Sequence, residues 1–92
     1  MSRFLIEVPH APGAASCANA IEIFHRTGSH FLTHADWGCK DGEHKAWIVV
    51  DVDTKDEARN IVPAEFRPVA KIVHLNAFSP SDAEWMRRQH GA

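Results

Sequence analysis

The sequence predicts an α+β domain, with a four-stranded antiparallel sheet, two main helices on one of its faces and a short C-terminal helix. Two observations lead to this prediction. Short runs of alternating apolar and polar residues, as in half-buried strands, are separated by stretches with helical periodicity or helix-capping residues. The 92 residues are 45% hydrophobic, which is ordinary for a globular protein and argues against disorder. We expect residues 1–92 to form a single domain.

The first strand and the first helix follow from the N-terminal third of the chain. A strand is expected over residues 3–8, where apolar and polar side chains alternate. Its inward side is expected to carry Phe4, Ile6 and Val8. A helix is expected over residues 14–27, and Gly28 is a typical C-terminal stop. Cys17 falls on the apolar side of this helix, and we interpret it as a small core residue.

A β-hairpin is expected next. Its two strands are predicted over residues 31–37 and 44–52, which are rich in β-prone residues. Asp41-Gly42 lies between them and suits the two central positions of a type I′ turn. Such a turn fixes the pairing of the strands, so Cys39 is expected to lie opposite His44 near the tip.

The second half of the chain predicts a helix, a strand and a terminal helix. Thr54-Lys-Asp-Glu57 is a capping box that begins a helix, and Pro63 limits this helix to about two turns. A fourth strand is expected over residues 71–78. Ser81-Asp-Ala-Glu84 is a second capping box and predicts the terminal helix. Trp85 is expected to anchor that helix on the body or on a partner chain.

The order β-α-β-β-α-β predicts a ferredoxin-like, split-βαβ arrangement that leaves one sheet face open. Residues 30–80 resemble the muconolactone isomerases of the dimeric α+β barrel superfamily. They share a hairpin ending in Val-Val-Asp-Val-Asp, a helix opening at Thr54, the break at Pro63 and a strand ending near Phe78-Ser-Pro. The histidines also resemble those of small ferredoxin-like proteins that bind nickel. The resemblance implies a homodimer through the open sheet face, with pockets between sheet and helices or at the interface.

Strand periodicity gathers polar residues on the open sheet face. The predicted register pairs His34 with Val49 and Asp36 with Trp47. The expected group consists of Glu7, His34, Asp36, Trp47 and, in one of two orientations open to the fourth strand, His74. The other orientation turns His74 toward the helices.

This open-face group has the composition of a small-molecule site. A histidine beside a carboxylate is held in one tautomer and its pKa rises, which suits proton transfer near neutral pH. His34 would then act as the general base, with Asp36 or Glu7 orienting it. Trp47 and His74 would contact the ligand together with Glu7, because an indole gives a flat apolar wall. The alternative interpretation is a set of polar contacts within a dimer interface.

A metal site is a second candidate. Cys39 and His44 are a soft and a borderline ligand for Zn²⁺ or Ni²⁺, and they are expected to be cross-strand neighbours. His10, which follows the first strand, or Asp41 would complete the set. The alternative is an exposed thiol and imidazole at a loop tip.

Composition narrows the functional classes. A net charge of -2, with no basic cluster longer than Arg87-Arg88, gives no electrostatic footprint for nucleic acid. The longest apolar run, residues 46–50, is far short of a membrane span. We therefore expect a small cytoplasmic protein that binds a ligand or metal ion near the hairpin. The alternatives are an enzyme, such as an isomerase or cofactor-free monooxygenase acting on a small organic molecule, and a purely structural dimerisation module.

Overall fold

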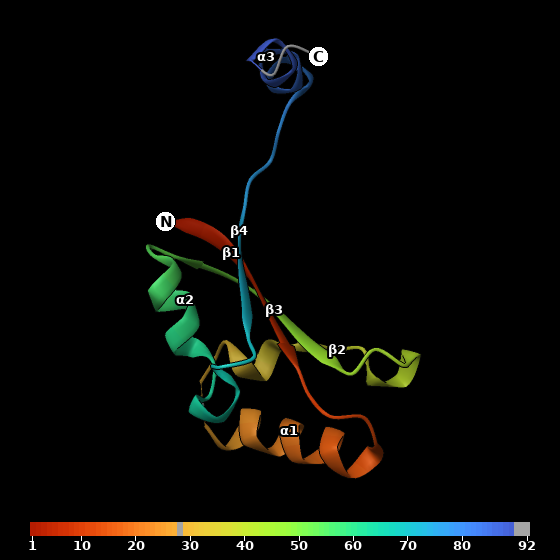
Figure 1. Cartoon of the computed structure of the whole chain (residues 1–92). Coiled ribbons are helices and arrows are strands. Elements are labelled where there is room, and N and C mark those ends of the chain that lie inside the picture. Colours follow the sequence, from red (N-terminus) through yellow and green to blue (C-terminus); the bar gives the residue numbers. More distant parts are fainter. Residues whose placement is uncertain (28, 90–92) are drawn as a thin grey trace.

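The structure, a computed structural model, describes residues 1–27 and 29–89. Within these residues the chain forms the strands β1 (Ser2–Pro9), β2 (Asp36–Trp37), β3 (Lys45–Val52) and β4 (Lys71–Leu75), and the helices α1 (Ala14–Arg26), α2 (Lys55–Ile61) and α3 (Pro80–Gln89). Short 3-10 turns lie at η1 (Leu32–His34), η2 (Cys39–Asp41) and η3 (Ala64–Phe66). The strands form one antiparallel sheet in the order β2-β3-β1-β4 (Figure 1). The predicted α+β class, the four-stranded antiparallel sheet and the short terminal helix are thereby confirmed.

The core lies between one face of the sheet and the helices α1 and α2. The inward side of β1 is buried as predicted, and β3 contributes Ala46, Ile48 and Val50. Phe24 of α1 and Ala58 of α2 pack into the same cluster. Both helices therefore cover the same sheet face, and the opposite face of the sheet stays open.

The sequence left two orientations open for β4, and the structure has the one in which His74 faces the helices. Ile72 pairs with Ile6 and His74 with Phe4, so both β4 residues lie on the helix-covered side. Ile72 is buried, and the His74 ring packs 5.0 Å from that of Phe4. The orientation that puts His74 on the open face is wrong, because Ile72 is the β4 side chain that fills the core. β4 also ends at Leu75, short of the predicted residue 78.

The predicted strand over residues 31–37 is mostly wrong. Only Asp36 and Trp37 pair with β3, although their partners Trp47 and Ala46 are the predicted ones. The residues before them form η1, in which Leu32 is buried and the Thr33 hydroxyl donates to the His30 carbonyl at 2.9 Å. Side-chain bonds of this kind offer the backbone an alternative to a strand ladder. The pairing of His34 with Val49 is therefore lost.

The hairpin turn also differs from the prediction. A type I′ turn needs positive φ at both central residues. Here Cys39–Asp41 forms η2, and of the pair Asp41-Gly42 only Gly42 has positive φ, at 80°. The Gly38 carbonyl accepts from the N–H groups of Asp41 and Glu43, at 2.9 and 3.0 Å. The loop is longer than predicted, but the strand before it, β2, pairs with β3 in the predicted register.

Helix caps set the bounds of α2 and α3. The Glu57 N–H donates to Thr54 Oγ1 at 3.1 Å, which confirms the predicted start of α2. At α3 the cap is Ser79 and not the predicted Ser81, because the Asp82 N–H donates to Ser79 Oγ at 3.2 Å. The Ser79 N–H donates in return to Asp82 at 2.9 Å. The helix stop predicted at Gly28 lies outside the described residues.

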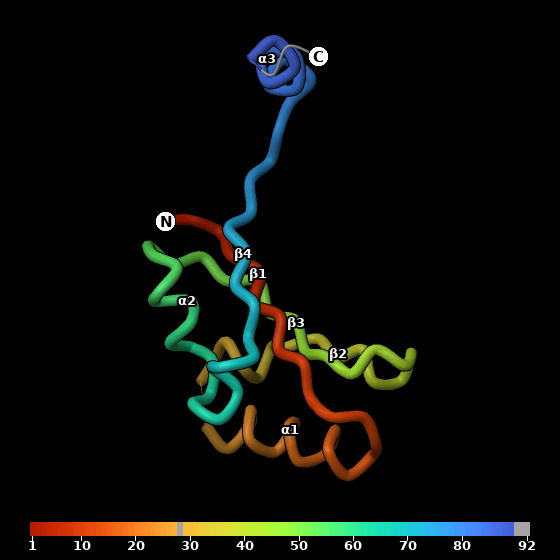
Figure 2. Tube along the Cα trace, viewed as in Figure 1, coloured from red at the N-terminus to blue at the C-terminus, as the bar shows by residue number. Residues whose placement is uncertain are grey.

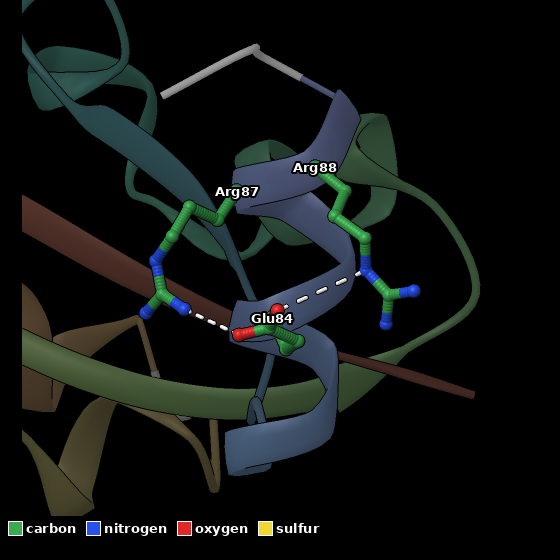
Figure 3. Close-up of polar contacts among 3 residues, drawn as sticks. All are labelled: Glu84, Arg87 and Arg88. Carbon is green, nitrogen blue, oxygen red and sulfur yellow. Dashed lines mark hydrogen bonds and ion pairs between the residues drawn. The ribbon is translucent and has the colours of Figure 1, made fainter.

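α3 stands apart from the sheet on an extended segment, residues 76–79 (Figure 2). Trp85 is 60% exposed, so its predicted anchoring on the body is wrong, and anchoring on a partner chain stays a prediction. The polar side of α3 carries ion pairs from Glu84 to Arg87 and Arg88 (Figure 3). No helix in the described part of the chain has the length and apolar character needed to cross a membrane.

Candidate metal centre

Three potential metal ligands meet at the end of the sheet where β1 ends and β3 begins. They are His10 after β1, Cys39 in η2 and His44 before β3, and one donor atom of each lies within 4.8 Å of the others. The His10 N–H donates to the His44 carbonyl at 3.0 Å, which fastens the two segments together. The structure therefore brings together the three residues that the sequence predicted as ligands.

His10 is oriented by its own backbone neighbour. Its Nδ1 lies 2.9 Å from the Ala11 carbonyl oxygen, which can only accept, so Nδ1 carries the proton in the neutral ring. The lone pair on Nε2 then faces the Cys39 Sγ, 3.2 Å away. A hydrogen bond that fixes the far nitrogen of a ligating histidine is a common feature of metal sites.

His44 contains an unsatisfied buried atom. Among the described side chains, its Nδ1 is the one buried nitrogen or oxygen without a hydrogen-bond partner. Its ring lies edge-on to that of His10, with 5.7 Å between centroids. Leaving a buried polar atom unpaired costs about 1–3 kcal/mol, and a bound metal ion would remove that cost if this nitrogen ligated it.

Cys17 joins the group, against its predicted role as a core residue. It is only half-buried, and its Sγ lies 2.6 Å from the Cys39 Sγ. The topology explains the contact, since α1 begins at the sheet end where β1 stops and where the β2–β3 loop also lies (Figure 1). The predicted topology already puts the start of α1 and the β2–β3 loop at the same end of the sheet, and this signal could have identified the pair.

The two thiols influence one another electrostatically. The pKa of Cys39 is raised above that of an ordinary thiol, first by its hydrogen bond to Cys17, then by burial and by repulsion from the Cys17 thiolate. Two sulfurs at this distance resist carrying charge together. A metal ion that takes Cys39 as a ligand must therefore displace its proton.

Hollows on the surface give access to the sulfurs. A cavity of about 450 Å³ has largely apolar walls, and it is lined by Gly13, Ala14, Cys17, Ala18, Ile21, Cys39, Lys40 and His44. A second hollow of about 420 Å³ also reaches Cys17 and Cys39, from the side of Asp36 and Trp37. Small solutes can thus approach both thiols.

The predicted open-face group is only partly assembled. Trp47 Nε1 donates to Glu7 Oε1 at 3.1 Å, and Lys45 Nζ lies 3.8 Å from Glu7 Oε2. Asp36 lies opposite Trp47 in the β2–β3 register. His74 is on the other face, so these residues do not form one surface with it.

His34 has different neighbours from those predicted. It lies in η1, where its Nδ1 is 3.1 Å from the His30 carbonyl oxygen and its ring centroid is 4.5 Å from that of His30. A hollow of about 220 Å³ is lined by His30, Phe31, His34, Ile48 and Val49. The orientation of His34 therefore comes from η1, and its role as a general base stays a prediction.

Comparison with known proteins returns no match to any family model, curated protein or solved structure.

Proposed function

We propose that this protein binds a divalent transition-metal ion, Zn²⁺ or Ni²⁺, through His10, Cys39 and His44. The observation that carries the proposal is the convergence of three donor atoms within 4.8 Å. The unpaired Nδ1 of His44 and the backbone-fixed ring of His10 support it. One thiolate and two imidazoles form a donor set that suits Zn²⁺ and Ni²⁺ better than Mg²⁺ or Ca²⁺.

Three protein ligands would leave one coordination position for another molecule. Zn²⁺ sites with three protein ligands usually keep their fourth position for water or a substrate. The cavity lined by Cys39 and His44 lies beside that position. Its apolar wall supports a small organic ligand bound together with the metal.

The test is metal binding by untagged protein, measured by calorimetry and elemental analysis with Zn²⁺ and Ni²⁺. We expect one ion per chain, and a loss of at least tenfold in affinity for H10A, C39S and H44N. The exposed His25, whose Nδ1 contacts the Ile21 carbonyl in α1, supplies the matched control H25A. Equal affinities for all four variants, each with a native circular dichroism spectrum, would contradict the proposal.

We further propose a ferredoxin-like fold that forms a homodimer through the open sheet face. The central place of β1, between β3 and β4, supports the fold. Val49 of β3 is 56% exposed on the open face; Leu5 lies opposite it on β1, and Val73 of β4 lies opposite Leu5. Light scattering tests the dimer: V49K should give monomers, whereas V69K, at a residue 54% exposed elsewhere, should not.

We propose a cytoplasmic location, a reducing compartment in which both cysteines would be free thiols, as they are in the structure. The two other functions predicted from the sequence, an enzyme and a structural dimerisation module, stay predictions. In the predicted enzyme, Asp36 or Glu7 orients His34; in the structure the Nδ1 of His34 contacts the His30 carbonyl, and Glu7 accepts from Trp47.

A further inference from the structure

We propose that Cys17 and Cys39 form a reversible disulfide that removes the thiolate ligand from the metal site. The formation of the disulfide stands on the thiol pair alone, whereas its effect on metal binding rests on the proposed function. Both cysteines are reduced in the structure, with their Sγ atoms 2.6 Å apart.

The distance between the sulfurs favours a disulfide over shared coordination of one ion. Two thiolates bound to one tetrahedral Zn²⁺, each about 2.3 Å from it, lie about 3.7 Å apart. A disulfide has an S–S length of about 2.05 Å. The observed 2.6 Å lies closer to the bonded distance. Cys17 is therefore a resolving partner for Cys39 and not a fourth ligand.

Access and partners also suit thiol–disulfide exchange. Both sulfurs border the 450 Å³ cavity and the 420 Å³ hollow, through which a small disulfide can reach them. Lys40 lines both spaces and adds a positive charge that would attract an anionic reagent. His10 Nε2 lies 3.2 Å from Cys39 Sγ.

The reaction balances with a low-molecular-weight disulfide, such as glutathione disulfide, as the oxidant. The Cys39 sulfur loses its proton and attacks the oxidant, which forms a mixed disulfide and releases one glutathione thiolate. The Cys17 sulfur then loses its proton, attacks Cys39 Sγ and releases the second glutathione. Two protein thiols are oxidised, one disulfide is reduced to two thiols, and the two protons pass to the glutathione thiolates.

Oxidation would change the metal site in one defined way. Cys39 in a disulfide has no thiolate to offer, so only His10 and His44 would remain of the three ligands. Metal binding would fall on oxidation and return on reduction. A bound ion would in turn protect Cys39 from oxidation.

The test uses the full chain, stripped of metal by a chelator and equilibrated in glutathione buffers of increasing oxidised fraction. Acid quenching, alkylation and mass spectrometry then report the products. We expect a product of single-chain mass with an internal Cys17–Cys39 linkage, and glutathione adducts in its place for C17S and C39S. S16A, beside Cys17, is the control that should behave as wild type. Stable glutathione adducts on the wild type, without the internal linkage, would overturn the proposal.

Zn²⁺ titration of the reduced and oxidised wild type completes the test. We expect at least a tenfold loss of affinity on oxidation, restored by a reductant. If C17S weakens Zn²⁺ binding as much as C39S, Cys17 is a metal ligand and the resolving role is wrong. If the linkage forms but the reduced protein binds neither Zn²⁺ nor Ni²⁺, the proposed function fails while the disulfide stands.

Discussion

Trp47 donates its indole N–H to Glu7 across the β1–β3 pair, with 3.1 Å between Nε1 and Oε1. A hydrogen bond to a charged group contributes about 1.5–3 kcal/mol, and partial exposure reduces this value. We expect W47F to lower the free energy of unfolding by about 1 kcal/mol, and a double-mutant cycle with E7A, which removes the acceptor, to recover that coupling. Urea denaturation measures it. The control W85F, at the exposed Trp of α3, should leave the free energy of unfolding unchanged. A coupling energy near zero for the Trp47–Glu7 pair would show that the bond does not stabilise the protein.

Gly38 holds the loop that carries Cys39 and His44. A Cβ at this position would lie 2.8 Å from the Glu43 backbone oxygen and from the Trp47 ring. We expect G38A to destabilise the protein by about 1–3 kcal/mol, as overpacking does, and to weaken metal binding. G42A is the matched comparison, since nothing crowds its Cβ and only its φ of 80° is strained. Weaker metal binding by G42A than by G38A would argue against crowding as the cause.

Metal affinity should depend steeply on pH because of the Cys17–Cys39 pair. The raised pKa of Cys39 means that the ion displaces a proton throughout the neutral range, so affinity rises with pH until that pKa is passed. The raised pKa of Cys39 also makes the stability of the fold depend on pH. The contribution to stability is complete below the pKa of the thiol in the unfolded chain, about 8.5, and it is lost as pH rises through the pKa of Cys39 in the folded protein. In C17A the ultraviolet thiolate absorbance of Cys39 should titrate at lower pH, and an unchanged midpoint would contradict the assigned cause.

The start of α3 should respond to acid independently of the sheet. Hydrogen bonds from the backbone N–H and hydroxyl of Ser79 hold the pKa of Asp82 below its usual range. The resulting stabilisation is present above the pKa of an unfolded aspartate, about 3.9, and is lost as pH falls through the folded value. We expect the NMR shifts of residues 80–89 to report fraying of α3 over that interval. In S79A the pKa of Asp82 should rise, while the NMR resonances of the sheet should stay unchanged. If the sheet resonances shift together with those of α3, α3 packs on the sheet and the prediction is wrong.

Local signals were sufficient for β1, β3 and α2. Alternation around Ile6 and the capping box at Thr54 act within a few residues, and both predicted the observed element. The β2 strand failed because burial of Leu32 and the hydroxyl bond of Thr33 favour a 3-10 turn, which strand periodicity does not reveal. The orientation of β4 could not be predicted from local signals, because it depends on which of its side chains packs into the core.

The candidate site was predictable in its ligands but not in its surroundings. His10, Cys39 and His44 were proposed from residue type and position, and the structure brings them together although the expected turn is absent. The role of Cys17 was missed because helix periodicity predicts which face of α1 a residue is on, but not which residues pack against that face. The contact with Cys39 arises because the start of α1 and the β2–β3 loop meet at one end of the sheet.

The candidate ligands come from two separate parts of the chain, because α1 and β2 separate His10 from Cys39 and His44. An unfolded chain would hold these groups at random distances, so only the folded chain offers the complete set of donors. Any ion that binds there stabilises the fold, by about 2.7 kcal/mol when its free concentration is 100 times the dissociation constant. The thermal unfolding midpoint would then rise with added metal and report the occupancy of the site without an assay of activity.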